Sequence, residues 1–231
     1  MITIKNLNKT YQTFFHEPVR ALKNISLQIK EGEVFGLLGP NGAGKTTTIK
    51  LILDLLKPDT GAIKVCHKKY IGYLPEEPYF YTYLTGQELL EFYAKVFKIT
   101  QPQDRIEELL KRVDLFDARY QRLGNYSKGM LQRIAIAQAL INQPKLLLLD
   151  EPSSGLDPIG RYKMKEIILA EKQKGTTILF CSHILSDVEQ ICDNVAILNK
   201  GSIIAQGSVK QVRGPNKTLE DSFIAYINQQ A

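Results

Sequence analysis

Nine consecutive residues, Gly39 to Thr47, read GPNGAGKTT and combine three glycines with a lysine and two threonines. Glycine lets the backbone turn so tightly that successive N–H groups point at phosphate oxygens. In this spacing the lysine reaches the β- and γ-phosphates of a nucleotide, and the hydroxyl after it binds Mg²⁺. The segment therefore predicts a nucleoside triphosphate site, with contacts from Gly39, Pro40, Asn41, Gly42, Ala43, Gly44, Lys45, Thr46 and Thr47.

A pair of acidic residues follows an apolar run later in the chain. Leu146 to Leu149 are four leucines, and Asp150 and Glu151 come directly after them. Because ligands bind at the carboxyl ends of core strands in an α/β sheet, we expect these acids to lie at a ligand site. We predict that Asp150 holds Mg²⁺ and that Glu151 polarises the attacking water. A solvated acidic turn would explain the same residues, but the phosphate loop before it favours catalysis.

The flanking segments have the patterns that such a site needs. Val34–Leu38 is typical of a short buried strand, and Thr46–Leu56 carries apolar residues at helical spacing until Pro58. The first thirty residues alternate in polarity, which predicts a small antiparallel sheet. Residues 85–142 have helical periodicity, and further along we expect a helix over 159–174, a strand over 177–181 and a hairpin around Asn199-Lys200-Gly201.

These patterns predict an α/β fold: a P-loop NTPase core with a parallel-strand sheet, an antiparallel β subdomain and an inserted α-helical subdomain. We assign residues 1–84 and 143–210 to a RecA-like core with its β flank. Residues 85–142 form the helical subdomain, and 211–231 form a C-terminal helical tail, whose last short helix begins with a capping box at Thr218–Asp221.

The segment before the acidic strand is more specific. Tyr126–Arg133 reads YSKGMLQR and resembles the signature segment of the ATP-binding cassette (ABC) ATPases. Two matches follow in the family's order: Ser154–Asp157 resembles the D-loop, and Ser182-His183 resembles the switch histidine. The resemblance extends from Ile2 to about residue 209, and the ordered set of motifs is more specific than any one of them.

The resemblance implies that each ATP lies between two chains. Ser127 and Gly129 would contact a γ-phosphate across the dimer interface, and Asp157 is counted among the nucleotide contacts. Ser127 also begins a predicted helix, so it is expected to act as a cap as well. His183 would sense the γ-phosphate, although a lone histidine after an apolar strand is more often structural.

Tyr11 falls where the family stacks an aromatic ring on adenine. Apart from the resemblance, a half-buried strand tyrosine explains it equally well. Phe14 and Phe15 follow closely and leave open a different assignment of the stacking residue.

The chain departs from the family's pattern at three places, one of which is the stretch Gly61–Tyr70, shorter than is usual in the family. The signature is usually written LSGGQ, and here Tyr126, Lys128 and Met130 replace the leucine, the first glycine and the glutamine. Glu76 stands where the Q-loop glutamine is usual. A carboxylate can bind Mg²⁺ or orient water, so we count Glu76 as a metal ligand beside Thr46 and Asp150.

The resemblance implies the ATP-binding and hydrolysing subunit of an ABC transporter, with ATP and Mg²⁺ as cofactors. Two such subunits, as a homodimer or heterodimer, would close on ATP and drive a separate integral-membrane permease. No apolar stretch approaches the roughly 18 residues that a spanning helix needs, so we expect a cytoplasmic protein, peripheral on the cytoplasmic face of the membrane through that partner. The aromatic run Pro78–Leu84 is a candidate docking surface, and packing of the subdomain against the core is the alternative.

Other functions fit less well. A soluble ABC-type ATPase that acts on the ribosome or DNA is the main alternative, and a subunit that has lost hydrolysis is a weaker one. The net charge of +6 is mild and the lysines are scattered, so no nucleic-acid partner is expected. Three cysteines, an odd number without a C-x-x-C pair, predict reduced thiols rather than a zinc site.

Overall fold

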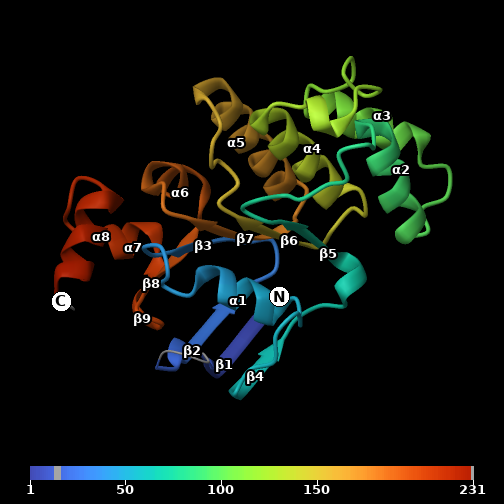
Figure 1. Ribbon diagram of the computed structural model, residues 1–231. Helices are drawn as coiled ribbons and strands as arrows, with labels where there is room; N and C mark the ends of the chain where they lie inside the picture. The colour runs from blue at the N-terminus through green and yellow to red at the C-terminus, as the bar shows by residue number, and fades with distance from the viewer. Residues whose placement is uncertain (13–16, 230–231) are drawn as a thin grey trace. The chain divides into compact units, whose positions relative to one another are not determined.

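A computed structural model describes residues 1–12 and 17–229 (Figure 1). The chain divides into two compact units: Met1–Cys66 together with Thr177–Ala231, and His67–Thr176. The subdomain limits predicted at residues 84, 142 and 210 stay predictions.

The first unit begins with an antiparallel sheet. β1 (Ile2–Tyr11) lies between β2 (Val19–Ile29) and β4 (Thr60–Lys64) and pairs antiparallel with both. Alternation in the sequence puts every second side chain on one face of a strand. That face is buried at Ile2, Ile4, Ile25, Leu27 and Ile29. The predicted antiparallel β subdomain is confirmed.

The first unit also contains parallel strands. β3 (Val34–Leu38) lies between β7 (Thr177–Ser182) and β8 (Asn194–Asn199), and all three run in the same direction. Every residue of β3 and β7 is buried, as expected for parallel strands covered on both faces. The predicted hairpin is present, because β9 (Ser202–Ser208) returns antiparallel to β8.

Helix α1 (Lys45–Ile52) begins inside the predicted phosphate loop and contacts β2 (Figure 1). The sequence predicted a helix to Leu56, but the helix ends at Ile52. Asp54 has a φ of 59°, in the left-handed region, so the chain turns there instead of continuing the helix.

Three helices follow β7 in the first unit. α6 (Leu185–Ile191) precedes β8, and α7 (Val209–Arg213) and α8 (Leu219–Asn228) follow β9. The capping box predicted at Thr218 is confirmed, because the Thr218 hydroxyl accepts from the Asp221 N–H and the Asp221 carboxylate accepts from the Thr218 N–H.

The second unit contains two parallel strands and four α-helices. β5 (Ile71–Leu74) pairs parallel with β6 (Leu146–Asp150), which is buried throughout. Helices α2, α3 and α4 pack on one another, and α4 also contacts β5 (Figure 1). The helices are α2 (Gly86–Val96), α3 (Gln103–Arg112), α4 (Lys128–Leu140) and α5 (Pro158–Gln173), with short 3₁₀ turns at Lys68–Tyr70 and Leu123–Asn125. Among the described residues, none of the helices is both long enough and apolar enough to cross a membrane.

A buried ion pair joins α5 to α3. Glu171 on α5 is 4% exposed and accepts hydrogen bonds from Arg112 on α3, from Lys174 and from the Thr176 hydroxyl. Burial by itself would raise the pKa of the Glu171 carboxyl. The hydrogen bonds and charges of Arg112 and Lys174 outweigh it and hold that pKa below its ordinary value.

Replacement of Glu171 by Gln is expected to lower the free energy of unfolding by about 2 kcal/mol at pH 7, because hydrogen bonds to charged groups contribute about that much. A carboxyl whose pKa is lower in the folded state stabilises the fold above its unfolded pKa, and this contribution is lost as the pH falls through the folded pKa. The difference between wild type and Glu171→Gln should therefore shrink between about pH 5 and pH 3. Urea unfolding across this range measures it, with the exposed Glu77→Gln as control. A difference that stays constant with pH would contradict the assignment.

Candidate functional site

The phosphate loop follows β3 and leads into α1. Its turn depends on Gly42 and Gly44, with φ values of 78° and 113°, which residues other than glycine rarely adopt. Gly44 is the N-cap of α1 and offers no side-chain cap, so the first N–H groups of the helix are left to a ligand or solvent. The local sequence thus produces a helix start with the geometry that the motif predicts for binding an anion.

Gly39 is required for a different reason. A Cβ at this position would lie 2.3 Å from the carbonyl oxygen of Leu198 in β8. This oxygen belongs to the backbone of β8, so it cannot move aside as the end of a flexible side chain can. The loop therefore passes so close to β8 that position 39 has no room for a side chain.

Lys45 is the first residue of α1 and is 7% exposed. Its Nζ donates hydrogen bonds to the carbonyl oxygens of Gly39 at 2.8 Å and Pro40 at 3.4 Å. The ammonium is therefore held by the loop itself, at the place where phosphate oxygens are expected. Thr46 follows and is half-buried.

Tyr11 ends β1, and its hydroxyl lies 3.3 Å from the Thr47 Oγ1 in α1. The structure thus brings the predicted stacking residue to the helix of the phosphate loop. Phe14 and Phe15, the alternative stacking residues, lie outside the described residues.

His183 lies at the same sheet edge as the phosphate loop. Leu38, the last residue of β3, pairs with Ser182, the last residue of β7. The loop and His183 therefore leave neighbouring parallel strands at their carboxyl ends, and the His183 side chain is exposed.

The acidic pair lies at the carboxyl end of β6 in the second unit. Asp150 is 1% exposed and Glu151 is 4% exposed. Glu151 has a φ of 49°, which is uncommon outside glycine and turns the backbone immediately after Asp150. Glu76 is exposed two residues after β5, whose last residue, Leu74, pairs with Leu149. The solvated acidic turn is therefore wrong for Asp150 and Glu151, which are buried.

The signature residues and the D-loop form one surface of the second unit. Ser127 caps α4 by accepting the Met130 N–H at 3.2 Å, and Asp157 caps α5 by accepting the Gly160 N–H at 2.7 Å. Ser127, Gly129 and Asp157 also line a pocket of about 340 Å³. The expected cap at Ser127 is confirmed, and the pocket leaves room for a second role.

Two cations in this pocket were missed by the sequence reasoning. Arg133 and Lys163 both bind the Asp114 carboxylate, at 3.3 Å and 2.6 Å. Hydrogen bonding from Lys163 holds the pKa of Asp114 below its ordinary value, together with the charge of Arg133. Arg133 belongs to the signature segment, but nothing local in the sequence pairs it with Lys163.

Tyr126, which stands where LSGGQ has leucine, is buried, and its hydroxyl makes a specific hydrogen bond. Its hydroxyl donates to the Ala118 carbonyl oxygen at 2.9 Å, and burial raises the pKa of the phenol. A Cβ on Gly86 would lie 2.5 Å from this hydroxyl. The tyrosine therefore has room because the first residue of α2 is a glycine without a side chain.

The donor set fits Mg²⁺. Among the described residues there is no group of three or more His, Cys, Asp or Glu side chains that could hold a metal ion. Mg²⁺ does not need such a cage, since it is usually held by one or two carboxylates together with waters and substrate phosphates. Asp150 in the second unit offers a buried carboxylate, and Thr46 in the first unit offers a hydroxyl oxygen.

The comparisons agree with the motifs. A sequence model of the family described as ABC transporter matches residues 22–154. An ABC transporter ATP-binding protein from Nostoc sp. (strain PCC 7120) is 49% identical over 94% of this chain and 69% of its own length. The solved structure of an ATP-binding subunit of an ABC transporter has a TM-score of 0.88 and 29% identity, over 98% of this chain and 99% of its own. A dimeric ATP-binding cassette in a post-hydrolysis state, bound to ADP and Pi, has a TM-score of 0.83 and 27% identity, over 91% and 99%.

These proteins confirm the α/β P-loop fold and the resemblance drawn from the signature segment. None of them points to the alternative of a soluble ATPase acting on ribosomes or DNA. The chain belongs to the ABC transporter family, as an ATP-binding subunit with ATPase activity.

Proposed function

We propose that this chain is one of two ATPase subunits, as a homodimer or a heterodimer, that drive a separate integral-membrane permease. The similarity to a dimeric cassette supports the pairing. The similarity to an ABC transporter ATP-binding protein supports the transport role. In this proposal the chain is cytoplasmic and is held at the cytoplasmic face of the membrane by the permease.

One observation carries the pairing. Ser127, Gly129 and Asp157 line a common pocket of about 340 Å³, and the first turn of α4, whose Met130 N–H is capped by Ser127, begins at that pocket. Ser127 and Gly129 belong to the second unit, whereas the phosphate loop belongs to the first. We infer that the pocket receives the γ-phosphate of an ATP bound by the phosphate loop of the partner chain.

The chemistry follows from the residue types. Lys45 neutralises charge on the β- and γ-phosphates, and Tyr11 stacks on the adenine. Bound Mg²⁺, held by Thr46 and Asp150, would offset the negative charge that develops on the phosphates. Glu151 polarises the attacking water, and His183 senses the γ-phosphate. ATP binding closes the pair of subunits, and hydrolysis with loss of product opens it.

Glu76 is proposed as a further metal ligand. Glu76→Ala is expected to raise the Mg²⁺ concentration for half-maximal hydrolysis by about tenfold, the scale on which residues around a metal change its affinity. ATP binding without metal should change much less. Phosphate release measured across a Mg²⁺ series tests this, with Glu77→Ala, its exposed neighbour, as the matched control. An unchanged Mg²⁺ dependence would make Glu76 a surface acid.

The permease is proposed to dock on the aromatic run, Pro78–Leu84. Tyr79, Tyr81 and Tyr83 are 91%, 60% and 65% exposed, and the rings of Tyr81 and Tyr83 stack at 5.5 Å. The exposed fraction of Tyr79 leaves its side chain available to a partner. Exposed aromatic side chains of this kind are favoured at protein interfaces.

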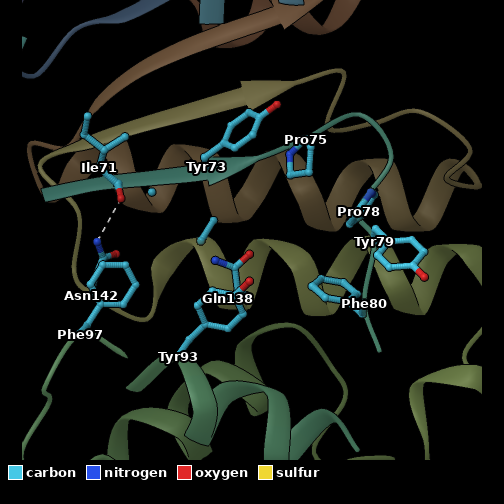
Figure 2. Close-up of a pocket in the computed structure, with 12 residues that line it drawn as sticks. Ile71, Tyr73, Pro75, Pro78, Tyr79, Phe80, Tyr93, Phe97, Gln138 and Asn142 are labelled. Carbon is cyan, nitrogen blue, oxygen red and sulfur yellow. Dashed lines mark hydrogen bonds between the residues drawn. The ribbon is translucent and has the colours of Figure 1, made fainter. Parts of the chain in front are cut away.

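A pocket of about 270 Å³ lies beside the run, between β5, α2 and α4 (Figure 2). Tyr93 and Gln138 face each other in it, and Asn142 donates a hydrogen bond to the Ile71 carbonyl oxygen at its far end. Pro78, Tyr79 and Phe80 border the opposite end in Figure 2. The pocket and the run together offer a partner a groove with an aromatic edge.

Charged substitutions at Tyr79 and Tyr81 are expected to release the chain from membranes of its native host into the soluble fraction, because a buried charge opposes association. ATP binding should be unchanged. Fractionation followed by immunodetection measures the distribution. Tyr120→Glu is the matched control, since Tyr120 is 68% exposed in the same unit but lies outside the run. Double variants that remain membrane-bound, or a wild type that never co-fractionates with membranes, would contradict the docking proposal.

A further inference from the structure

Lys128, where the family usually has glycine, lies across the D-loop. A Cβ placed on Gly155 would be 2.5 Å from Lys128 Cε, 2.8 Å from its Nζ and 2.9 Å from its Cδ. The lysine stem therefore covers the space in which any other residue at 155 would put its side chain. Gly155 also has a φ of 71°, so its conformation and its contact both favour glycine.

Two further observations concern the same elements. Leu156 borders the space beside Gly129, since a Cβ added there would lie 3.7 Å from one of its methyl groups. Gln132, 3% exposed, donates a hydrogen bond from Nε2 to the Pro152 carbonyl oxygen at 3.2 Å. Positions 128 and 132 are four residues apart and share a face of α4, so this face contacts the 152–157 segment at both ends of one turn.

The Lys128 side chain is exposed, and its ammonium makes no hydrogen bond or ion pair among residues 1–12 and 17–229. An ion pair among these residues therefore does not explain the position of the Lys128 side chain. The contact that remains is the one between its stem and Gly155. Long lysine stems often cover apolar surface in this way while the charged end stays in water.

We propose that Lys128 is a positioning residue, whose stem holds the 152–157 segment against the start of α4. Ser127, Gly129 and Asp157 would then form one surface that faces the ATP bound by the partner chain. This inference rests on the proposed dimer. A glycine at 128 could not make this contact. Where LSGGQ has its first glycine, this chain thus has a side chain that links the signature segment to the 152–157 segment.

The test uses the full chain carrying Glu151→Gln, so that ATP is bound without turnover. Light scattering gives the ATP concentration, with Mg²⁺ present, at which half of the chains are dimeric. Lys128→Ser should raise this concentration about fivefold, in the range of couplings between residues in contact. Lys128→Met, which keeps a stem without the charge, should stay close to the parent. Thermal unfolding midpoints should be alike in all three, and Lys95→Ser, another exposed lysine of the second unit, is the control.

Other outcomes would overturn the inference. Equal ATP requirements for all variants would show that the contact has no role, and an effect of Lys128→Met as large as that of Lys128→Ser would assign the role to the charge. A parent chain that stays monomeric with saturating ATP would instead overturn the proposed dimer. The two failures are therefore distinguishable.

Gly155→Ala supplies a second arm. The added methyl group would meet the Lys128 stem at 2.5 Å and displace it. Gly155→Ala should raise the ATP concentration at which half of the chains are dimeric. The increase should be larger in the chain with Lys128 than in the Lys128→Ser chain, where only backbone strain remains. Equal effects in the two chains would show that the residues are not coupled.

Discussion

A chain carrying Glu151→Gln is expected to bind ATP but to hydrolyse it about 10²- to 10⁴-fold more slowly than wild type, the usual effect of removing a general base. The amide keeps the size of the side chain at this buried position and removes the charge that polarises water. Phosphate release measures the rate, and titration calorimetry measures ATP binding. Because ATP persists, the variant should also become dimeric with ATP and Mg²⁺, which light scattering detects.

The control for this result is Glu220→Gln, an exposed acid at the start of α8, which should hydrolyse ATP at the wild-type rate. Retention of wild-type hydrolysis in Glu151→Gln would remove Glu151 from the catalytic role. A variant that binds ATP and stays monomeric would count against a site shared between two chains.

Lys45→Ala is expected to weaken ATP binding about 10- to 100-fold, since charge-assisted hydrogen bonds contribute roughly 1.5–3 kcal/mol each. The ammonium already lies over the carbonyl oxygens of Gly39 and Pro40, where the phosphates are expected. Titration of the variant with ATP measures the loss.

Lys50→Ala is the matched control, because Lys50 lies on the same helix, carries the same charge and is exposed. It should bind ATP as wild type does. Equal losses in the two variants would indicate a general effect of charge on α1, and unchanged binding in Lys45→Ala would contradict the phosphate loop assignment.

Features encoded over a few residues could be predicted from the sequence. The phosphate loop, the acidic end of β6 and the Ser127 cap each depend on residue types at short spacing, and the structure places them on the expected strands and helices. The order of these motifs along the chain then identified the family before any geometry was known.

Features that depend on contacts distant in sequence could not be predicted. Lys128 and Gly155 are separated by a helix, a strand and a turn, so no local pattern joins them. The pairing of Arg133 and Lys163 through Asp114 has the same origin. The early end of α1 was missed because the apolar spacing continues past the residue at which the backbone turns.

At Glu151 the left-handed backbone lowers stability at the position that is proposed to activate water. A non-glycine residue held with a φ of 49° costs on the order of 1 kcal/mol or more. Glycine relieves that cost, and asparagine tolerates the conformation better than most residues do. Selection for heat resistance alone would therefore favour replacing this acid, whereas the proposed role of Glu151 in hydrolysis requires its carboxylate.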